Sequence, residues 1–114
     1  MSRLLKAITP PETEAGFQEA VMALAHTQGW LVAHFRPART DQGSRTPVAA
    51  EGAGFPDLVL VRDRVIFAEL KTERGRVRPE QQRWLDALAG AGAEAVLWRP
   101  SDWETIVDVL ARRR

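Results

Sequence analysis

Two short apolar runs with a charged break between them constrain the fold of this chain more than any other feature. The runs are residues 58–61 (LVLV) and 65–68 (VIFA), and the tripeptide at 62–64 (RDR) separates them. Short runs rich in β-branched side chains on either side of a polar break predict an antiparallel hairpin. If the turn is centred on the middle residue of the tripeptide, Asp57 lies directly opposite Glu69.

The predicted hairpin brings ionisable side chains together. Because side chains alternate between the two faces of a strand, Asp57, Glu69 and Lys71 all project from one face. Directly opposed residues have Cβ atoms about 5 Å apart, so two carboxylates become neighbours with a lysine one step along. A one-residue bulge would instead turn Asp57 to the opposite face.

Two adjacent carboxylates at the end of an apolar sheet are unfavourable unless a cation neutralises them. Hard oxygen ligands suit Mg²⁺ or Mn²⁺, ions that commonly also bind phosphate oxygens. The alternative interpretation is a set of solvated charges at the end of a hairpin. The alternation of Glu69 and Lys71 with Leu70 after an apolar run is typical of a buried strand end and favours a metal-dependent phosphodiesterase site.

Composition indicates one soluble domain. The chain has 114 residues, of which 45% are apolar and 27% charged, and that balance is typical of a globular protein with its own core. We expect no membrane span and no secretory signal, and hence a cytoplasmic protein. The chain has no cysteine and only two histidines, so thiolate metal sites are excluded and a zinc site is not expected.

The remaining pattern predicts an α/β fold in a single domain, residues 1–114. We expect one mixed four-stranded sheet flanked by helices, in the order helix, three strands, helix, strand, with an extra C-terminal helix. The expected segments are a helix capped at Thr9 and ending near Gln28, a strand at 30–36, a long loop at 37–55, the hairpin, a basic connection at 72–78, a helix from Pro79 to the glycines at 90 and 92, a strand at 94–98, and a helix begun by a capping box at 101–104.

The predicted second and third strands carry residues 54–58 (GFPDL) and 67–71 (FAELK), and Gln81 follows early in the next helix. These ordered motifs together resemble the VRR-NUC (virus-type replication-repair nuclease) domain of the PD-(D/E)xK nuclease superfamily. Residues 14–18 (EAGFQ) and 29–34 (GWLVAH) resemble the beginning of small stand-alone phage and bacterial members. The resemblance covers nearly the whole chain and implies the restriction-endonuclease-like αβββαβ core.

The resemblance also implies roles for individual residues. Asp57 and Glu69 match the metal ligands, joined by the backbone carbonyl of Leu70, and Lys71 matches the lysine that orients or deprotonates the attacking water. Glu14 matches an acidic residue of the first helix that contacts the metal through water. Gln81 matches a helix residue that lines the site. The macrodipole of a helix also accounts for an acidic residue like Glu14 in its first turn.

Contacts to nucleic acid are expected from one histidine and several arginines. His34 follows the first strand's alternation, and we weigh substrate contact there against an ordinary packed histidine. The arginines lie on the two connections near the carboxylate end of the sheet, where they can neutralise phosphates. They are Arg36, Arg39, Arg74, Arg76 and Arg78.

The expected function is a Mg²⁺- or Mn²⁺-dependent, structure-selective DNA endonuclease acting in replication, repair or recombination, in a bacterial cell or encoded by a phage or prophage. We expect a homodimer because such a core has one active site whereas branched DNA needs two cuts, and the resemblance also implies it. The first alternative is a Holliday-junction resolvase. The second is a catalytically silent DNA-binding subunit of a larger complex, against which the intact set of Asp57, Glu69 and Lys71 argues.

Overall fold

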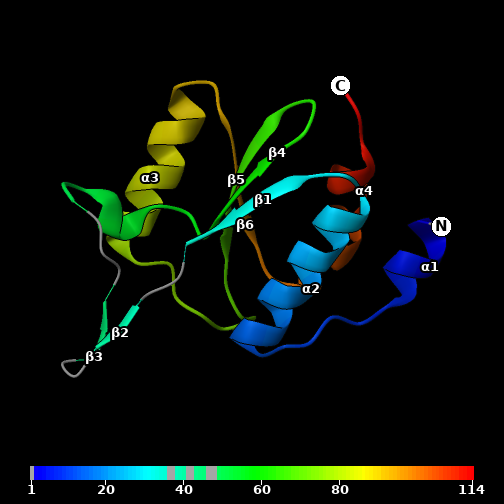
Figure 1. The fold of residues 1–114 in the computed structure, drawn as a ribbon, viewed down its shortest axis with the longest axis horizontal. Coiled ribbons are helices and arrows are strands. Elements are labelled where there is room, and N and C mark those ends of the chain that lie inside the picture. The colour runs from blue at the N-terminus through cyan, green and yellow to red at the C-terminus, as the bar shows by residue number, and fades with distance from the viewer. Residues whose placement is uncertain (1, 36–37, 41–42, 46–48) are drawn as a thin grey trace.

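The computed structural model describes residues 2–35, 38–40, 43–45 and 49–114. The described chain begins with helices, continues with a run of strands and ends with a helix, a strand and a last helix, and one small two-stranded sheet is set apart from the main one (Figure 1). The elements are α1 (Ser2–Ala7), α2 (Glu14–Thr27), β1 (Leu31–His34), β2 (Ala38–Thr40), β3 (Gly43–Arg45), the 3₁₀ turn η1 (Gly52–Gly54), β4 (Leu58–Val61), β5 (Val65–Leu70), α3 (Pro79–Gly90), β6 (Glu94–Trp98), the 3₁₀ turn η2 (Pro100–Asp102) and α4 (Trp103–Ala111).

The main sheet has four strands in the order β1-β4-β5-β6. β4 pairs antiparallel with β1 and with β5, and β6 pairs parallel with β5. A parallel pair needs a crossover connection, which α3 supplies between β5 and β6. This mixed sheet flanked by helices, with a helix after the last strand, confirms the predicted fold class.

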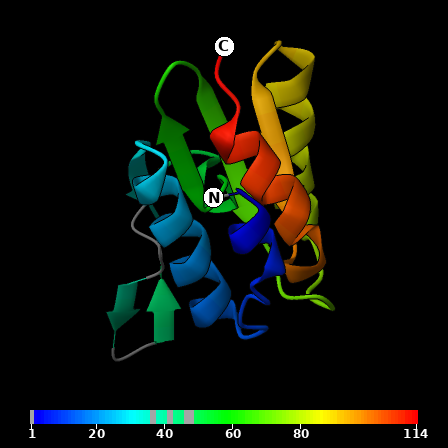
Figure 2. The same cartoon turned by 90° about the vertical axis from the view of Figure 1, so that its right-hand side faces the viewer.

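The helices cover the two faces of the sheet unequally. Figures 1 and 2 show α2 and α4 together on one face, with α1 against α4, and α3 alone on the other face. Among the described residues α3 contacts β6 and η1, and β1 and β4 are the strands of that face with no helix packed closely on them. Among the described residues no helix is long and apolar enough to cross a membrane.

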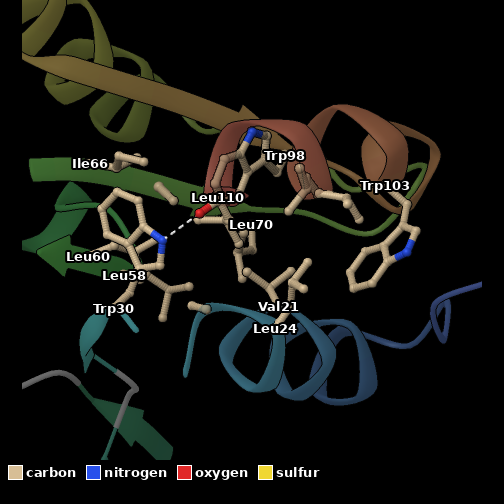
Figure 3. Close-up of a cluster of buried hydrophobic side chains, with 14 of the residues drawn as sticks. Val21, Leu24, Trp30, Leu58, Leu60, Ile66, Leu70, Trp98, Trp103 and Leu110 are labelled. Carbon is tan, nitrogen blue, oxygen red and sulfur yellow. Dashed lines mark hydrogen bonds between the residues drawn. The ribbon is translucent and has the colours of Figure 1, made fainter. Parts of the chain in front are cut away.

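The core lies between the sheet and the pair α2 and α4 (Figure 3). Alternate residues of β4 and β5 point into it, and all are almost completely buried: Leu58, Leu60, Ile66, Ala68 and Leu70. Trp30 closes one end of the core, where its indole N–H donates a hydrogen bond of 2.9 Å to the carbonyl of Leu110. The other face of the sheet is therefore left to the alternate residues, among them those of the site.

The second helix begins later than predicted. Its N-cap is Thr13, whose hydroxyl accepts a hydrogen bond of 3.1 Å from the backbone N–H of Gly16, so the prediction of a cap at Thr9 is wrong. Two successive prolines explain the difference, because the residue before a proline is disfavoured from helical conformation and Pro10 precedes Pro11. The end of the helix is confirmed, since α2 stops at Thr27 and Gly29 follows with a φ of +86°.

The other differences concern short elements. The segment predicted as one long loop contains β2, β3 and η1, and α1 was not predicted at all. β1 is shorter than the predicted strand. The last helix follows η2, where the carboxylate of Asp102 accepts a hydrogen bond of 2.8 Å from the N–H of Arg99, so the capping box predicted from Ser101 is wrong. The predicted start of α3 at Pro79 and the bounds of β6 are confirmed.

Candidate active site

The hairpin has the predicted register. Leu58 pairs with Ala68 and Val61 pairs with Val65, and continuing this register by one residue sets Asp57 opposite Glu69. Asp57 stands just before β4, where its backbone is fixed because its carbonyl accepts a hydrogen bond of 2.9 Å from the N–H of the residue after β1. The turn and strand lengths of the hairpin thus bring the two carboxylates to one face of the sheet.

Asp57 is anchored through its side chain as well. Its Oδ2 accepts a hydrogen bond of 2.9 Å from the backbone N–H of Leu70, across the hairpin. This bond uses one carboxylate oxygen and fixes the plane of the group, so the other oxygen has a defined direction. Asp57 is partly buried, at the rim of the site.

Glu69 is the buried acid of the site. Its side chain is only 1% exposed, and among the described residues it is the one charged residue that is buried. Oε2 accepts a hydrogen bond of 3.0 Å from the side-chain amide of Gln81 and lies 3.4 Å from the ammonium of Lys71. Oε1 is buried without any hydrogen-bond partner in the described part of the chain. A buried carboxylate oxygen with no partner is costly and therefore calls for a ligand.

The electrostatics of the pair lead to the same conclusion. Burial, and then the neighbouring charge of Asp57, raise the pKa of Glu69 to about 7. Burial also raises the pKa of Asp57, although the N–H of Leu70 and the charge of Lys71 oppose that effect. Two carboxyl groups whose ionised forms are both disfavoured become compatible when a cation lies between them.

These groups fit a divalent cation of the magnesium type. The ligands available are carboxylate oxygens, with the backbone carbonyl of Leu70 on the same strand end, and hard oxygen ligands suit Mg²⁺ or Mn²⁺. The partnerless Oε1 of Glu69 is the specific position that such an ion would satisfy. Among the described residues no three acidic or histidine side chains converge on one point. Side chains alone would therefore leave coordination positions of the ion open to water or substrate.

Gln81 holds Glu69 from the neighbouring helix. Its amide N–H donates to Glu69, while its side-chain oxygen accepts a hydrogen bond of 2.9 Å from the backbone N–H of Arg78 at the start of α3. The same amide therefore caps the helix and orients the buried acid. Gly54 makes this possible, because a Cβ at that position would overlap the backbone carbonyl of Glu80 in the first turn of α3.

Glu14 is not part of the pair of carboxylates formed by Asp57 and Glu69. It is exposed and is the first residue of α2, a helix that contacts β5. In Figure 1 the beginning of α2 lies at the same end of the molecule as the end of β5. A contact to a metal through water stays a prediction for this residue, and the direct pair of acids is Asp57 with Glu69.

His34 lies one residue along β1 from the rung that holds the carboxylates. It is the last residue of β1, pairs with Leu58, and is half-buried. Its charge lowers the pKa of Asp57, which places the imidazole within electrostatic range of the site. Its contact with substrate stays a prediction.

The predicted phosphate-contacting arginines fall into two groups. Arg36 lies outside the described residues, and Arg39 is in β2, of whose side chains nothing is described. Arg74, Arg76 and Arg78 are exposed on the connection from β5 to α3, which starts directly after Lys71. The structure thus presents a basic segment at the edge of the carboxylate site.

A further residue, Arg99, was not among the predicted site residues. Its guanidinium donates hydrogen bonds to the carbonyls of Thr72, Glu73 and Gly75 at 2.7, 3.2 and 2.8 Å. The carboxylate of Glu73 in turn accepts a hydrogen bond of 3.0 Å from the N–H of Ser101. The residues just after β6 therefore fix the shape of the basic connection. The only hint of this role in the sequence is an isolated arginine directly after a predicted strand.

Comparisons with known proteins identify the class. The family model of the VRR-NUC domain matches residues 18–101. A solved structure titled "VRR_NUC domain" aligns with a TM-score of 0.59 at 22% sequence identity, over 80% of this chain and 89% of that chain. No curated protein matches.

The fold and the family match thus place the chain in a nuclease class of α/β domain. Because the family model covers most of the chain, the chain belongs to the VRR-NUC family. This confirms the resemblance seen in the sequence, and the structural alignment confirms the fold.

Proposed function

We propose that this protein is a Mg²⁺- or Mn²⁺-dependent endonuclease that hydrolyses phosphodiester bonds in branched, flapped or nicked DNA. The observation that carries the proposal is the buried, partnerless Oε1 of Glu69 beside Asp57. A structural carboxylate would have its oxygens satisfied by the protein, whereas a metal-binding carboxylate has an oxygen to spare. Membership of a nuclease family supports the same chemistry.

The site residues have distinct tasks in this reaction. Asp57, Glu69 and the carbonyl of Leu70 would hold the ion, which when bound polarises the scissile phosphate and lowers the pKa of its water. Lys71, whose Nζ lies 3.4 Å from Glu69, would orient the water, take part in moving its proton, and offset negative charge that develops on the phosphate. Gln81 keeps Glu69 in the orientation that leaves Oε1 directed to the ion.

DNA contact is proposed along the basic connection. Arg74, Arg76 and Arg78 are exposed and lie next in sequence to the site, so phosphates on either side of the cut would be within their reach. Arg99 fixes the backbone that carries them. Neither the sequence nor the described structure offers a recognition helix, so we propose that DNA shape is read rather than base sequence.

We further propose that the active form is a homodimer working in the cytoplasm of a bacterial cell, on host, phage or prophage DNA. Each chain has one carboxylate site, and branched DNA needs two cuts. On the face of the sheet that carries α3, the rung farthest from the carboxylates is unusually exposed for apolar residues: Leu31 at 75%, Val61 at 39% and Val65 at 42%. This rung crosses the edge strand β1 and the next two strands, β4 and β5, and would suit contact with a second copy.

The test compares the wild type with Glu69→Gln and Lys71→Ala. Labelled four-way junction, flapped, nicked and fully paired linear DNA would be incubated with Mg²⁺, Mn²⁺ or chelator. We expect metal-dependent cuts that are lost in both variants. Symmetric paired cuts confined to the four-way junction would favour a Holliday-junction resolvase, and binding with no cleavage under any condition would favour the silent DNA-binding alternative.

A further inference from the structure

A cluster of four aromatic rings stands on the face of the sheet that carries α3, and one of the rings, Trp84, comes from that helix. Phe55 is at its centre, with ring centroids 5.5 Å from Phe35, 6.0 Å from Phe67 and 5.1 Å from Trp84. All three contacts are edge-to-face, at 80–89° between ring planes. This cluster is separate from the main core, which lies on the other face of the sheet.

The cluster adjoins the carboxylate site through the backbone. The N–H of Phe35 donates a hydrogen bond of 2.9 Å to the carbonyl of Asp57, so Phe35, Asp57 and Glu69 occupy one rung across three strands. Side chains on one rung share a face of the sheet, and neighbouring strands are about 4.8 Å apart. Phe35 therefore stands next to Asp57 on the side away from Glu69.

The four rings differ in how far they are exposed. Phe35 is 47% exposed, whereas Phe55, Phe67 and Trp84 are half-buried. The indole N–H of Trp84 is occupied by the carbonyl of Glu51 at 2.8 Å, which fixes that ring in place. The arrangement is a supported ring, Phe35, with an open surface beside the site.

Resting on the proposed function, we propose that Phe35, supported by Phe55, is a stacking platform for an unpaired base adjacent to the scissile phosphodiester. The substrate class is then DNA with at least one unpaired nucleotide at the cut. Bases stack on aromatic side chains whatever their identity, so the platform needs no base-edge contacts. A base that is paired within a duplex is already stacked, and taking it out of the duplex costs free energy. The platform therefore favours flaps and branch points.

The proposal also explains why the ring of Phe35 is exposed although burying it would stabilise the fold. An aromatic ring that is half exposed next to a charged site loses part of the free energy that burial would give. The rungs farther along the same face carry exposed aliphatic residues, where a contact between two copies would bury them. Only at the rung of the carboxylates does an exposed aromatic ring occur on this face, among the described residues.

The test is a double-mutant cycle between the protein and the DNA. The cut site on flapped DNA would first be mapped with the wild type, and the unpaired nucleotide beside it made either normal or abasic. Binding would be measured by fluorescence anisotropy with Mg²⁺ in a Lys71→Ala background, with Phe35, Phe35→Leu or Phe35→Tyr. Leucine keeps the apolar packing against Phe55 without an aromatic plane, and tyrosine restores the plane.

With Phe35 we expect the abasic flap to bind about tenfold more weakly than the normal flap. Phe35→Leu should bind both flaps equally and as weakly as the abasic one, and Phe35→Tyr should recover the difference. Equal losses from the abasic site in all three proteins would overturn the platform while leaving the nuclease proposal intact. A change in oligomeric state of Phe35→Leu without coupling to the base would also overturn it and assign this ring to an interface between copies.

The platform and the proposed function fail in distinguishable ways. If the wild type neither binds nor cuts any DNA with Mg²⁺ or Mn²⁺, the proposed function is wrong and the platform falls with it. If the wild type cuts flapped DNA in preference to fully paired DNA, and Phe35→Leu keeps that preference in full, only the platform is wrong.

Discussion

The metal-free protein should lose stability as the pH rises from 5 to 8, because of Glu69. The pKa of Glu69 is about 7 in the folded protein, against an ordinary value of 4.5. Between these values the folded protein holds a proton that the unfolded chain has released. Raising the pH through this window therefore lowers the free energy of unfolding.

The size of the effect follows from the two pKa values. The gap between 4.5 and about 7 corresponds to about 3 kcal/mol in total, since one pKa unit is about 1.4 kcal/mol. Linkage places most of it, roughly 2–3 kcal/mol, between pH 5 and pH 8. In a domain of this size 1 kcal/mol moves Tm by about 3–6 °C, so we expect a fall on the order of 10 °C. The raised pKa of Asp57 acts in the same direction.

The assay is thermal unfolding followed by circular dichroism in chelator, from pH 5 to pH 8, with Glu69→Gln as the matched control. Glutamine has the same shape and no proton to lose, so its profile should be flatter by most of the predicted fall. The pKa values of Asp63 and Glu73 are lowered, so their linkage falls at more acidic pH and leaves this window clear. Identical profiles for the two proteins would refute the argument that Glu69 is a desolvated acid.

Three further predictions concern the neighbours of the pair. Lys71→Ala should lower the single-turnover cleavage rate on the order of a thousandfold and change DNA affinity only a few-fold, and a comparable loss in both would make Lys71 a binding residue. Replacing Arg74 and Arg78 by alanine should weaken DNA binding and reduce the slope of log affinity against log salt by about 2; an unchanged slope would remove the connection from the interface. Gly54→Ala should cost about 1–3 kcal/mol in thermal unfolding and also reduce cleavage, because its Cβ displaces the backbone of Glu80 and with it the helix that orients the buried acid. A variant of unchanged Tm would contradict the close packing.

The parts of the fold that were predicted correctly from the sequence are those in which apolar residues recur at regular intervals. The alternation of β-branched residues in β4 and β5, and a polar turn of fixed length, are enough to set the register that pairs Leu58 with Ala68. β6 and the start of α3 were also predicted, since proline marks the helix start and an apolar run marks the strand.

The parts that were missed lack such a period. Strands of three residues, such as β2 and β3, are too short to show alternation. α1 buries little of its surface, with Leu4 74% exposed, so it has no apolar stripe to recognise. The late start of α2 depends on the conformation of Pro10 and Pro11, where two sequence rules, a preferred proline at the first turn and a disfavoured residue before proline, point in opposite directions.

The candidate site divides in the same way. That Asp57 and Glu69 are opposed follows from counting residues along a hairpin, which sequence permits. That Gln81 bonds Glu69 and caps α3 at once depends on how a helix distant in sequence docks on the strand, and helix periodicity does not specify docking. The contact of Trp84 with Phe55 was missed for a related reason: its spacing also fits an ordinary core position, and Phe55 lies in a segment without any period.

The hairpin has a consequence for how such a site can change over generations. Each carboxylate is six residues from the centre of the turn, and the two arms of the hairpin act as a ruler. Loss or gain of one residue within an arm would turn Asp57 or Glu69 toward the core, whereas substitutions along the arms leave the count intact. Lengthening the tip beyond Val61 and Val65 leaves the count of both arms unchanged. Descendants of this chain can therefore vary the tip in length and the arms in composition, but they cannot vary the arms in length and keep the site.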